Sequence, residues 1–232
     1  MGSIKTEDSG TEMKRILHNE YLRLREGAEI LSKDNFGNKV LRLRDDSILK
    51  LFRIKHLISS ARLYPYSLRF VRHAERLSAL NIPTVEVINW FKIPSIKRTA
   101  VQYNKLEGDT LPRYLNNNVF TKETAQAFGA FVATLHNKGV YFRSIHLENI
   151  IVLPDKSFGL IDISDMMIYR HPLSLRMRNK NFYHLTRYET HRNLLKLELM
   201  TFIHAYSEQS NISGRRLSKF QKNLLRHFNV YS

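Results

Sequence analysis

Strand-like patterns occupy the first half of this chain, and helical patterns occupy most of the second half. Three alternating runs separated by turn-forming residues predict a meander of strands: Ala28–Lys33, Lys39–Arg44 and Ser47–Phe52. A helical pattern over Ser67–Leu80 is followed by two β-branched, aromatic runs over Thr84–Trp90 and Thr99–Tyr103. Strands and helices that segregate along a chain of 232 residues are typical of an α+β fold.

The second half begins at Asn104–Asp109, where the sequence becomes polar and contains a glycine. A short helix is predicted over Leu111–Leu115, and a longer one from a cap at Thr121 to about Asn137, with Gly139 just past its end. Further helical patterns, rich in Arg, Lys and His, extend from Arg178 onward. We therefore expect a β-rich lobe over residues 26–104 and a mainly helical lobe over residues 105–232.

Residues 1–25 are expected to form an N-terminal extension, in which Glu12–Leu24 has apolar residues at helical spacing. The chain contains no cysteine, which excludes disulfides, thiolate metal sites and cysteine nucleophiles and fits a cytoplasmic location. No apolar stretch approaches the roughly 18 residues needed to span a membrane.

The charge is strongly basic, with 37 Lys and Arg against 21 Asp and Glu, a formal net charge of +16. A surplus of this size favours polyanionic partners, namely nucleic acid, an anionic membrane surface or a phosphorylated glycan. Basic segments over Arg170–Arg192 and Arg215–Arg226 would serve such a partner, although both also fit solvated helix faces.

Lys50 and Glu75 are the candidate nucleotide-binding residues. A lysine on the third strand of the meander would contact the α- and β-phosphates as a point charge. Glu75 is expected on the inward face of the next helix, with Val71 and Ser78, where a carboxylate needs a partner and Lys50 would supply it. The alternatives are an exposed edge lysine and a local ion pair between Glu75 and neighbouring arginines.

Asn149 and Asp162 are the candidate metal ligands. Asn149 ends a polar loop before the strand predicted over Ile150–Leu153, and Asp162 lies within the second strand of the expected hairpin, Phe158–Ile163. Mg²⁺ prefers a few hard oxygen ligands together with phosphate oxygens and water. The alternatives are a turn residue and a strand-end cap. The turn at residues 34–38 lacks the spacing of a glycine-rich phosphate loop and also fits a plain hairpin.

The order of these elements and residues resembles the protein-kinase-like fold, with two lobes joined near residues 103–109. Within that superfamily the chain resembles the lipopolysaccharide core kinase and Kdo kinase group, and bacterial toluene tolerance proteins in particular. The resemblance covers roughly residues 26–190 and is carried by Lys50-Leu51-Phe52, the helix from Arg69 to Leu77, Tyr103 to Leu111, Leu135 to Tyr141, Leu147 to Ile150, and Leu160-Ile161-Asp162. It implies ATP and Mg²⁺ as cofactors and a sugar hydroxyl of a lipopolysaccharide-core-like acceptor, at the cytoplasmic side of the inner membrane.

The loop departs from the family at one decisive position. Sugar and aminoglycoside kinases of this superfamily have H-G-D-L-H-x-x-N there, and Ser144 replaces the Asp in this chain. A serine hydroxyl cannot accept a proton at neutral pH, so the family's general base is absent. General-base help is worth roughly 10²–10⁴-fold, and His146 is the candidate substitute because a histidine titrates near neutrality. A structural hydrogen bond in the loop is the alternative role for His146.

Three functions remain open from the sequence. The first is a phosphotransferase in which Ser144 and His146 face the acceptor. The second is a pseudokinase, a nucleotide-binding or scaffold module without efficient transfer. The third, supported only by the basic charge, is a nucleic-acid-binding protein.

Overall fold

A computed structural model of the chain describes residues 11–54, 65–117 and 120–229. The chain packs into two compact units. The first contains the described residues up to Glu75 together with Val85–Lys105, and the second contains Arg76–Thr84 together with the described residues from Leu106 onward. Strands dominate the first unit and helices dominate the second, which confirms an α+β chain with a β-rich N-terminal region and a helical C-terminal part.

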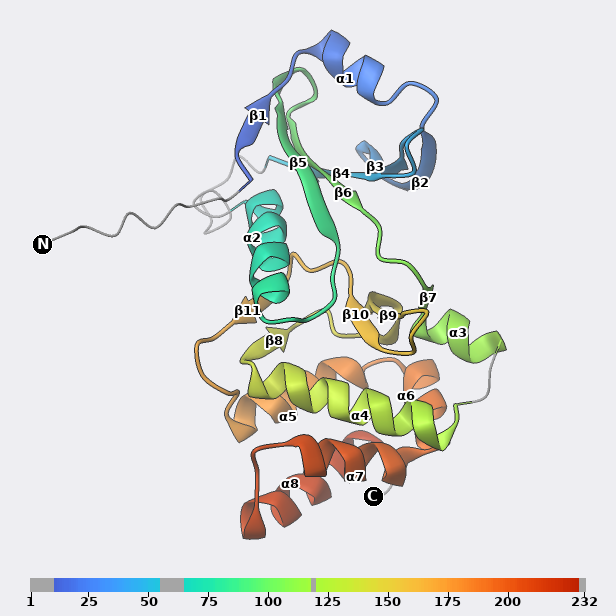
Figure 1. Ribbon diagram of the computed structural model, residues 1–232, viewed down its shortest axis with the longest axis vertical. Helices are drawn as coiled ribbons and strands as arrows, with labels where there is room; N and C mark the ends of the chain where they lie inside the picture. The colour runs from blue at the N-terminus through green and yellow to red at the C-terminus, as the bar shows by residue number, and fades with distance from the viewer. Residues whose placement is uncertain (1–10, 55–64, 118–119, 230–232) are drawn as a thin grey trace, which may run out of the picture. The chain divides into compact units, whose positions relative to one another are not determined.

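A six-stranded sheet forms the centre of the first unit, in the order β1-β5-β6-β4-β3-β2 (Figure 1). The strands are β1 (Met13–Arg15), β2 (Glu29–Asp34), β3 (Gly37–Arg42), β4 (Ile48–Arg53), β5 (Glu86–Ile93) and β6 (Arg98–Asn104). The short helix η1 (Pro94–Ile96) joins β5 to β6. Neighbouring strands are antiparallel except β1 and β5, which run parallel. The predicted meander and the two later strands are therefore confirmed.

The N-terminal segment forms a strand and a helix, so the prediction of one helix over Glu12–Leu24 is wrong in its first half. Met13–Arg15 pairs with β5 as β1, and α1 (His18–Leu24) starts afterwards. Tyr21 of α1 is buried in an apolar cluster that includes Leu41 and Leu49. Helical spacing within Glu12–Leu24 cannot show that Met13–Arg15 will pair with an open sheet edge, because strand pairing depends on residues far away in the chain.

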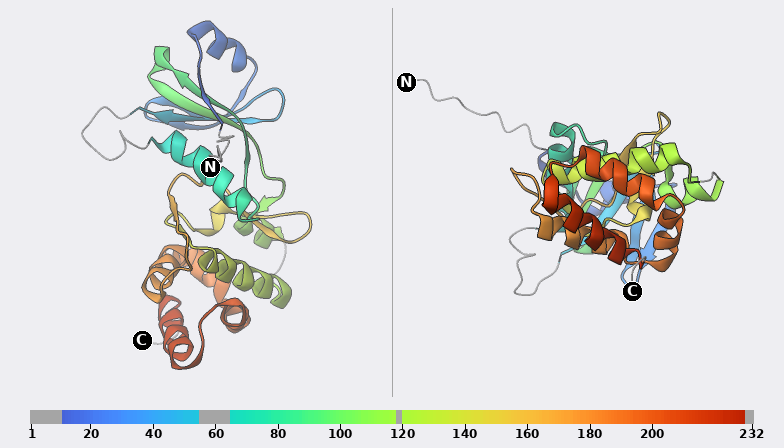
Figure 2. Two further views of the ribbon diagram at one scale, coloured as in Figure 1. Left: turned by 60° about the vertical axis from the view of Figure 1, so that its left-hand side comes forward. Right: turned by 90° about the horizontal axis from the view of Figure 1, so that it is seen from below.

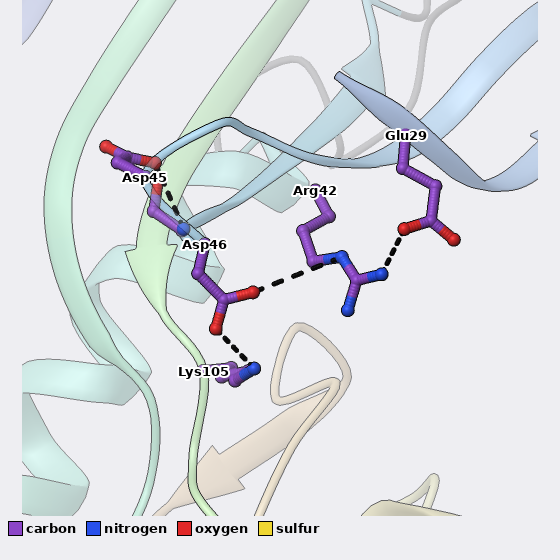
Figure 3. Close-up of polar contacts among 6 residues, drawn as sticks. Glu29, Arg42, Asp45, Asp46 and Lys105 are labelled. Atoms are coloured by element: carbon purple, nitrogen blue, oxygen red, sulfur yellow. Dashed lines mark hydrogen bonds and ion pairs between the residues drawn. The ribbon is translucent and has the colours of Figure 1, made fainter. Parts of the chain in front are cut away.

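Charged side chains surround the turn between β3 and β4 (Figure 3). The carboxylate of Asp46, which has a left-handed φ of 64°, contacts Lys105 at 2.5 Å and Arg42 at 4.0 Å. Arg42 also pairs with Glu29 on the neighbouring strand β2. The hydrogen bond from Lys105 to Asp46 is the main reason that the pKa of Asp46 lies below its usual value. All four side chains are largely exposed, so the network favours one turn conformation while adding little stability.

Helices and short hairpins make up the second unit. The strands are β7 (Asp109–Thr110), β8 (Val140–Phe142), β9 (Ile150–Val152), β10 (Phe158–Leu160) and β11 (Met166–Ile168). The helices are α3 (Leu111–Asn117), α4 (Lys122–Asn137), the short η2 (Leu147–Asn149), α5 (Leu175–Leu185), α6 (Glu189–Lys196), α7 (Leu199–Gln209) and α8 (Gly214–His227). Helix α2 (Tyr66–Ala79) begins in the first unit and ends in the second. The predicted hairpin is confirmed as β9 and β10, whereas the pairing of β8 with β11 was not anticipated.

Helix α4 is the central helix of the second unit and packs along α7 (Figure 1). Its predicted start is confirmed, because the Thr121 hydroxyl accepts a hydrogen bond from the backbone N–H of Thr124. Gly139, just beyond its end, has φ 78°, and a Cβ there would lie 2.4 Å from the carbonyl oxygen of Tyr169. Across the described parts of the chain, no helix combines the length and apolarity needed to cross a membrane.

Candidate functional site

The hairpin of the second unit brings Asn149 and Asp162 next to each other. Leu160 pairs with Ile150, and the backbone N–H of Ile161 donates to the carbonyl of Asn149 at 3.1 Å. Asp162 is the next residue, so it lies just past the end of β10 and not within a strand as the sequence suggested. It is exposed and has a left-handed φ of 52°. A left-handed φ is uncommon for residues other than glycine, and aspartate is one of the few that adopt it readily.

Asn149 is buried and its amide nitrogen organises the preceding loop. Its Nδ2 donates to the carbonyl oxygen of Ser144 at 2.9 Å and lies 3.2 Å from His146 Nε2. The carbonyl of Ser144 also accepts from the backbone N–H of His146 at 2.9 Å. Since the amide nitrogen is used within the loop, the amide oxygen of Asn149 is left without a hydrogen bond from any described residue. That oxygen is available to a ligand.

The tautomer of His146 follows from these contacts. Because Asn149 must donate to the Ser144 carbonyl, the same nitrogen also donates to His146, whose Nε2 is therefore the acceptor. The proton then resides on Nδ1, which is buried with no partner among the described residues. Burial lowers the pKa of His146, while the carboxylates of Asp162 and Glu148 oppose the shift. A neutral ring presenting an N–H is a hydrogen-bond donor, so the geometry favours a binding role over general-base catalysis.

His191 of α6 and Tyr188, the residue that caps the start of α6, complete this cluster and were missed as site residues. The rings of His191 and His146 stack with centroids 6.3 Å apart, and Tyr188 contacts both edge-on, at 5.3 and 5.8 Å. His191 is only 8% exposed, and its Nδ1 also lacks a partner in the described structure. Burial lowers its pKa, and His146 adds to the shift. No spacing rule links positions more than 40 residues apart, so only the fold could reveal this pair.

A buried network of side-chain hydrogen bonds holds Phe142, the residue just before the loop, in position. Arg178 donates to the hydroxyl of Tyr206 at 3.2 Å, and that hydroxyl lies 2.8 Å from Nδ1 of His136. His136 Nε2 lies 3.0 Å from Oδ1 of Asn181, whose Nδ2 donates to the carbonyl of Phe142 at 2.6 Å. Phe142 directly precedes the loop. This hydrogen-bond network therefore anchors the loop to α4, α5 and α7. Because each polar group bonds to the next, displacing one of them would break hydrogen bonds of its neighbours.

Lys50 belongs to the first unit, on the central strand β4. It is 8% exposed, so the alternative of an exposed edge lysine is wrong. Its ammonium group lies 5.7 Å from the ring of Phe52 and 5.6 Å from the ring of Phe70, within the range of cation–π attraction. A buried lysine is costly unless it is compensated, which marks this position as more than a solubilising charge.

Glu75 does not have the inward orientation that the sequence predicted. Its side chain is exposed, and its Oε1 accepts a hydrogen bond from the backbone N–H of Thr11 at 3.1 Å. The buried face of α2 passes through Phe70, Ala74 and Leu77, and one further step along a helix rotates a side chain by about 100°. Glu75 lies that one step beyond the buried face, so the expected contact with Lys50 is absent and its nucleotide-binding role stays a prediction.

Side-chain hydrogen bonds hold the turn of the hairpin formed by β2 and β3. The carboxylate of Asp34 accepts from the backbone N–H of Phe36 at 2.8 Å, and this bond is the main cause of its lowered pKa. Arg98 of β6 donates to the carbonyl of Phe36 at 2.8 Å, and Gly37 has φ 110°. The Phe36 carbonyl is therefore bound by an arginine side chain, which supports the interpretation of this segment as a plain hairpin turn.

The residues present fit a metal held jointly with phosphate groups. Nowhere in residues 11–54, 65–117 and 120–229 do three or more His, Cys, Asp or Glu side chains gather to hold a metal. Mg²⁺ in phosphotransferases is bound by one or two protein oxygens, with phosphates and water filling the remaining positions. The open amide oxygen of Asn149 and the exposed carboxylate of Asp162 match that requirement.

Comparison with known proteins adds no family assignment. Neither a family model nor a curated protein matches the chain.

Proposed function

We propose that this protein is a kinase-like phosphotransferase that uses ATP and Mg²⁺ to phosphorylate a sugar hydroxyl of a lipopolysaccharide-core-like acceptor. The observation that carries the proposal is that Asn149 and Asp162 flank the same end of one hairpin, where the Asn149 amide oxygen has no hydrogen bond from a described residue and the Asp162 carboxylate is exposed. Asn149 and Asp162 are the proposed metal ligands, and Lys50 is the proposed phosphate-binding cation. The resemblance in the order of motifs and elements supports the same reading.

The chemistry available to the loop is positioning and not proton abstraction. Ser144 is partly exposed, and its hydroxyl can hydrogen-bond an acceptor hydroxyl. His146 is arranged to donate from Nδ1, and the Nδ1 of the neighbouring His191 likewise has no partner among the described residues. Phosphoryl transfer has a loose transition state that depends mainly on alignment and charge neutralisation, so a loop without a base slows the reaction without forbidding it.

The acceptor class rests on the resemblance and on charge. A net charge of +16 exceeds what a nucleotide pocket requires and is complementary to an anionic glycolipid or phosphorylated glycan. Such an acceptor would place the protein in the cytoplasm, in peripheral contact with the inner membrane.

Thermal unfolding with ATP, with and without Mg²⁺, tests the nucleotide site. We expect Mg²⁺-dependent stabilisation that is lost in Asp162→Asn. The matched control is Glu189→Gln, which removes the same charge from an exposed position on α6. Equal stabilisation of Asp162→Asn and the unmodified protein would show that Asp162 is not a metal ligand.

A pseudokinase is the second candidate, and Ser144 is the observation that favours it. Phosphate transfer to purified core oligosaccharide separates the two candidates once ATP binding is established. Phosphotransfer by the unmodified protein identifies an enzyme. If only Ser144→Asp transfers phosphate, the natural protein is a nucleotide-binding module that lacks the loop aspartate needed for transfer to the acceptor.

A further inference from the structure

Helix α8 carries a stripe of cations along one side. Arg215, Lys219, Lys222 and Arg226 follow each other at intervals of four, three and four residues, which places them on one face. All four are exposed, and α8 contains no acidic residue. None of the four forms an ion pair with a carboxylate in the described part of the chain. The opposite face is the one that packs into the unit, through Phe220 and Leu224.

The basic stripe borders an apolar groove that is lined by residues of α7 and α8 and by Gln126 of α4. Helices α7 and α8 are the last two along the chain and have the orange-red and red colours in Figure 2. The groove has a volume of about 1120 Å³, slightly above the roughly 300–1,000 Å³ typical of small-molecule sites. Its apolar lining comes from Met200, Ile203 and Ala205 of α7 and from Leu225 of α8, while Lys222 and Arg226 line the α8 side. Met200 is 66% exposed, so its side chain is accessible at the surface of the groove.

Among the described residues that line the groove, Glu208 is the one carboxylate. It lies 3.3 Å from Nδ1 of His204 on the next turn of α7, so its charge is partly engaged within the helix. The cations of α8 therefore set the sign of the field on their side of the groove.

We infer that α8 and this groove form a docking surface for an anionic phospholipid in a bilayer, with the phosphate on Lys222 and Arg226 and an acyl chain in the groove. An apolar channel flanked by cations is complementary to a molecule with an anionic head and an apolar tail. Single-stranded nucleic acid would require aromatic side chains for base stacking, and the described residues that line the groove include no Phe, Tyr or Trp. Duplex nucleic acid would leave the apolar floor unused.

The strength of the interaction can be estimated from the stripe. Each Lys or Arg near an anionic leaflet strengthens binding by about fivefold. Removing three of the four cations should therefore weaken binding by about 100-fold. The effect is independent of ATP and of phosphotransfer, so failure of the lipid surface and failure of the proposed activity are separate results.

Flotation of the full chain with vesicles tests the inference, in the absence of ATP and at about 0.15 M ionic strength. The vesicles contain equal parts phosphatidylglycerol and phosphatidylcholine, and phosphatidylcholine alone is the neutral reference. The test variant is Lys219→Gln/Lys222→Gln/Arg226→Gln. The matched control removes three exposed lysines from α4, α5 and α6: Lys122→Gln/Lys180→Gln/Lys196→Gln. We expect a loss of about 100-fold for the test variant and a change within about fivefold for the control.

The groove is tested separately with Met200→Asp. Its control is Leu197→Asp, which removes an equally exposed apolar side chain, at 64%, outside the groove. We expect binding to fall about tenfold further for Met200→Asp than for Leu197→Asp. Equal losses in the two triple variants, or in the two single variants, would overturn the inference. So would absent vesicle binding, or tighter binding of RNA or DNA than of vesicles at the same salt.

Discussion

The buried histidine His136 makes the stability of this protein sensitive to acid. Its ring is fully buried, with Nε2–H donating to Asn181 and Nδ1 accepting from the hydroxyl of Tyr206. Because Asn181 donates its own amide hydrogen to Phe142, its oxygen can only accept, which fixes this tautomer. A second proton on His136 would confront the hydroxyl hydrogen of Tyr206 and add a cation close to Arg178.

Burial lowers the pKa of His136 to about 3, and the nearby Arg178 adds to the shift. In the unfolded chain a histidine titrates near its ordinary value of about 6.5. Between these two values the unfolded state binds a proton that the native state does not, so the free energy of unfolding falls as the pH falls. The slope approaches about 1.4 kcal/mol per pH unit, which amounts to about 2 kcal/mol between pH 7 and pH 5.

Urea denaturation of the unmodified protein and of His136→Gln at pH 7, 6 and 5 measures this contribution. Glutamine lacks the titrating ring but keeps one donor and one acceptor. We expect His136→Gln to be less stable by about 1–3 kcal/mol at pH 7, and this deficit to shrink by about 2 kcal/mol at pH 5. His204→Gln, on the exposed face of α7, controls for the substitution itself. A deficit that stays constant across the three pH values would refute the reasoning.

Substitutions at three positions test backbone and capping effects by the same denaturation assay. Asp162→Gly should still fold, because glycine tolerates a φ of 52°, but it should lose the Mg²⁺-dependent stabilisation by ATP; retained stabilisation would show that the Asp162 side chain does not bind the metal. Gly139→Ala should destabilise by about 2 kcal/mol or more, since a Cβ would lie 2.4 Å from the Tyr169 carbonyl; unchanged stability would mean that the segment shifts freely. Thr121→Ala should cost about 1 kcal/mol through the lost cap on α4, and Thr121→Ser should retain most of the stability.

Local sequence patterns predicted much of the secondary structure. The meander of β2, β3 and β4, the strands β5 and β6 and the capped start of α4 all follow from alternation, helical spacing and turn residues within a few positions. The adjacency of Asn149 and Asp162 was predictable for the same reason, because both flank one short hairpin. Each of these features depends on neighbours in the chain, and periodicity records such neighbours directly.

The remaining features depend on contacts between distant segments. Met13–Arg15 pairs with β5 because the sheet has an unpaired edge there. Glu75 is exposed because no other element of the described residues packs over its side of α2. The same holds for His191 and Tyr188, which meet His146 only because α6 packs beside the loop. The sequence by itself determined the α+β class and the hairpin that carries the candidate metal ligands. The tertiary structure decided which side chains are buried, because burial depends on partners that no local pattern contains.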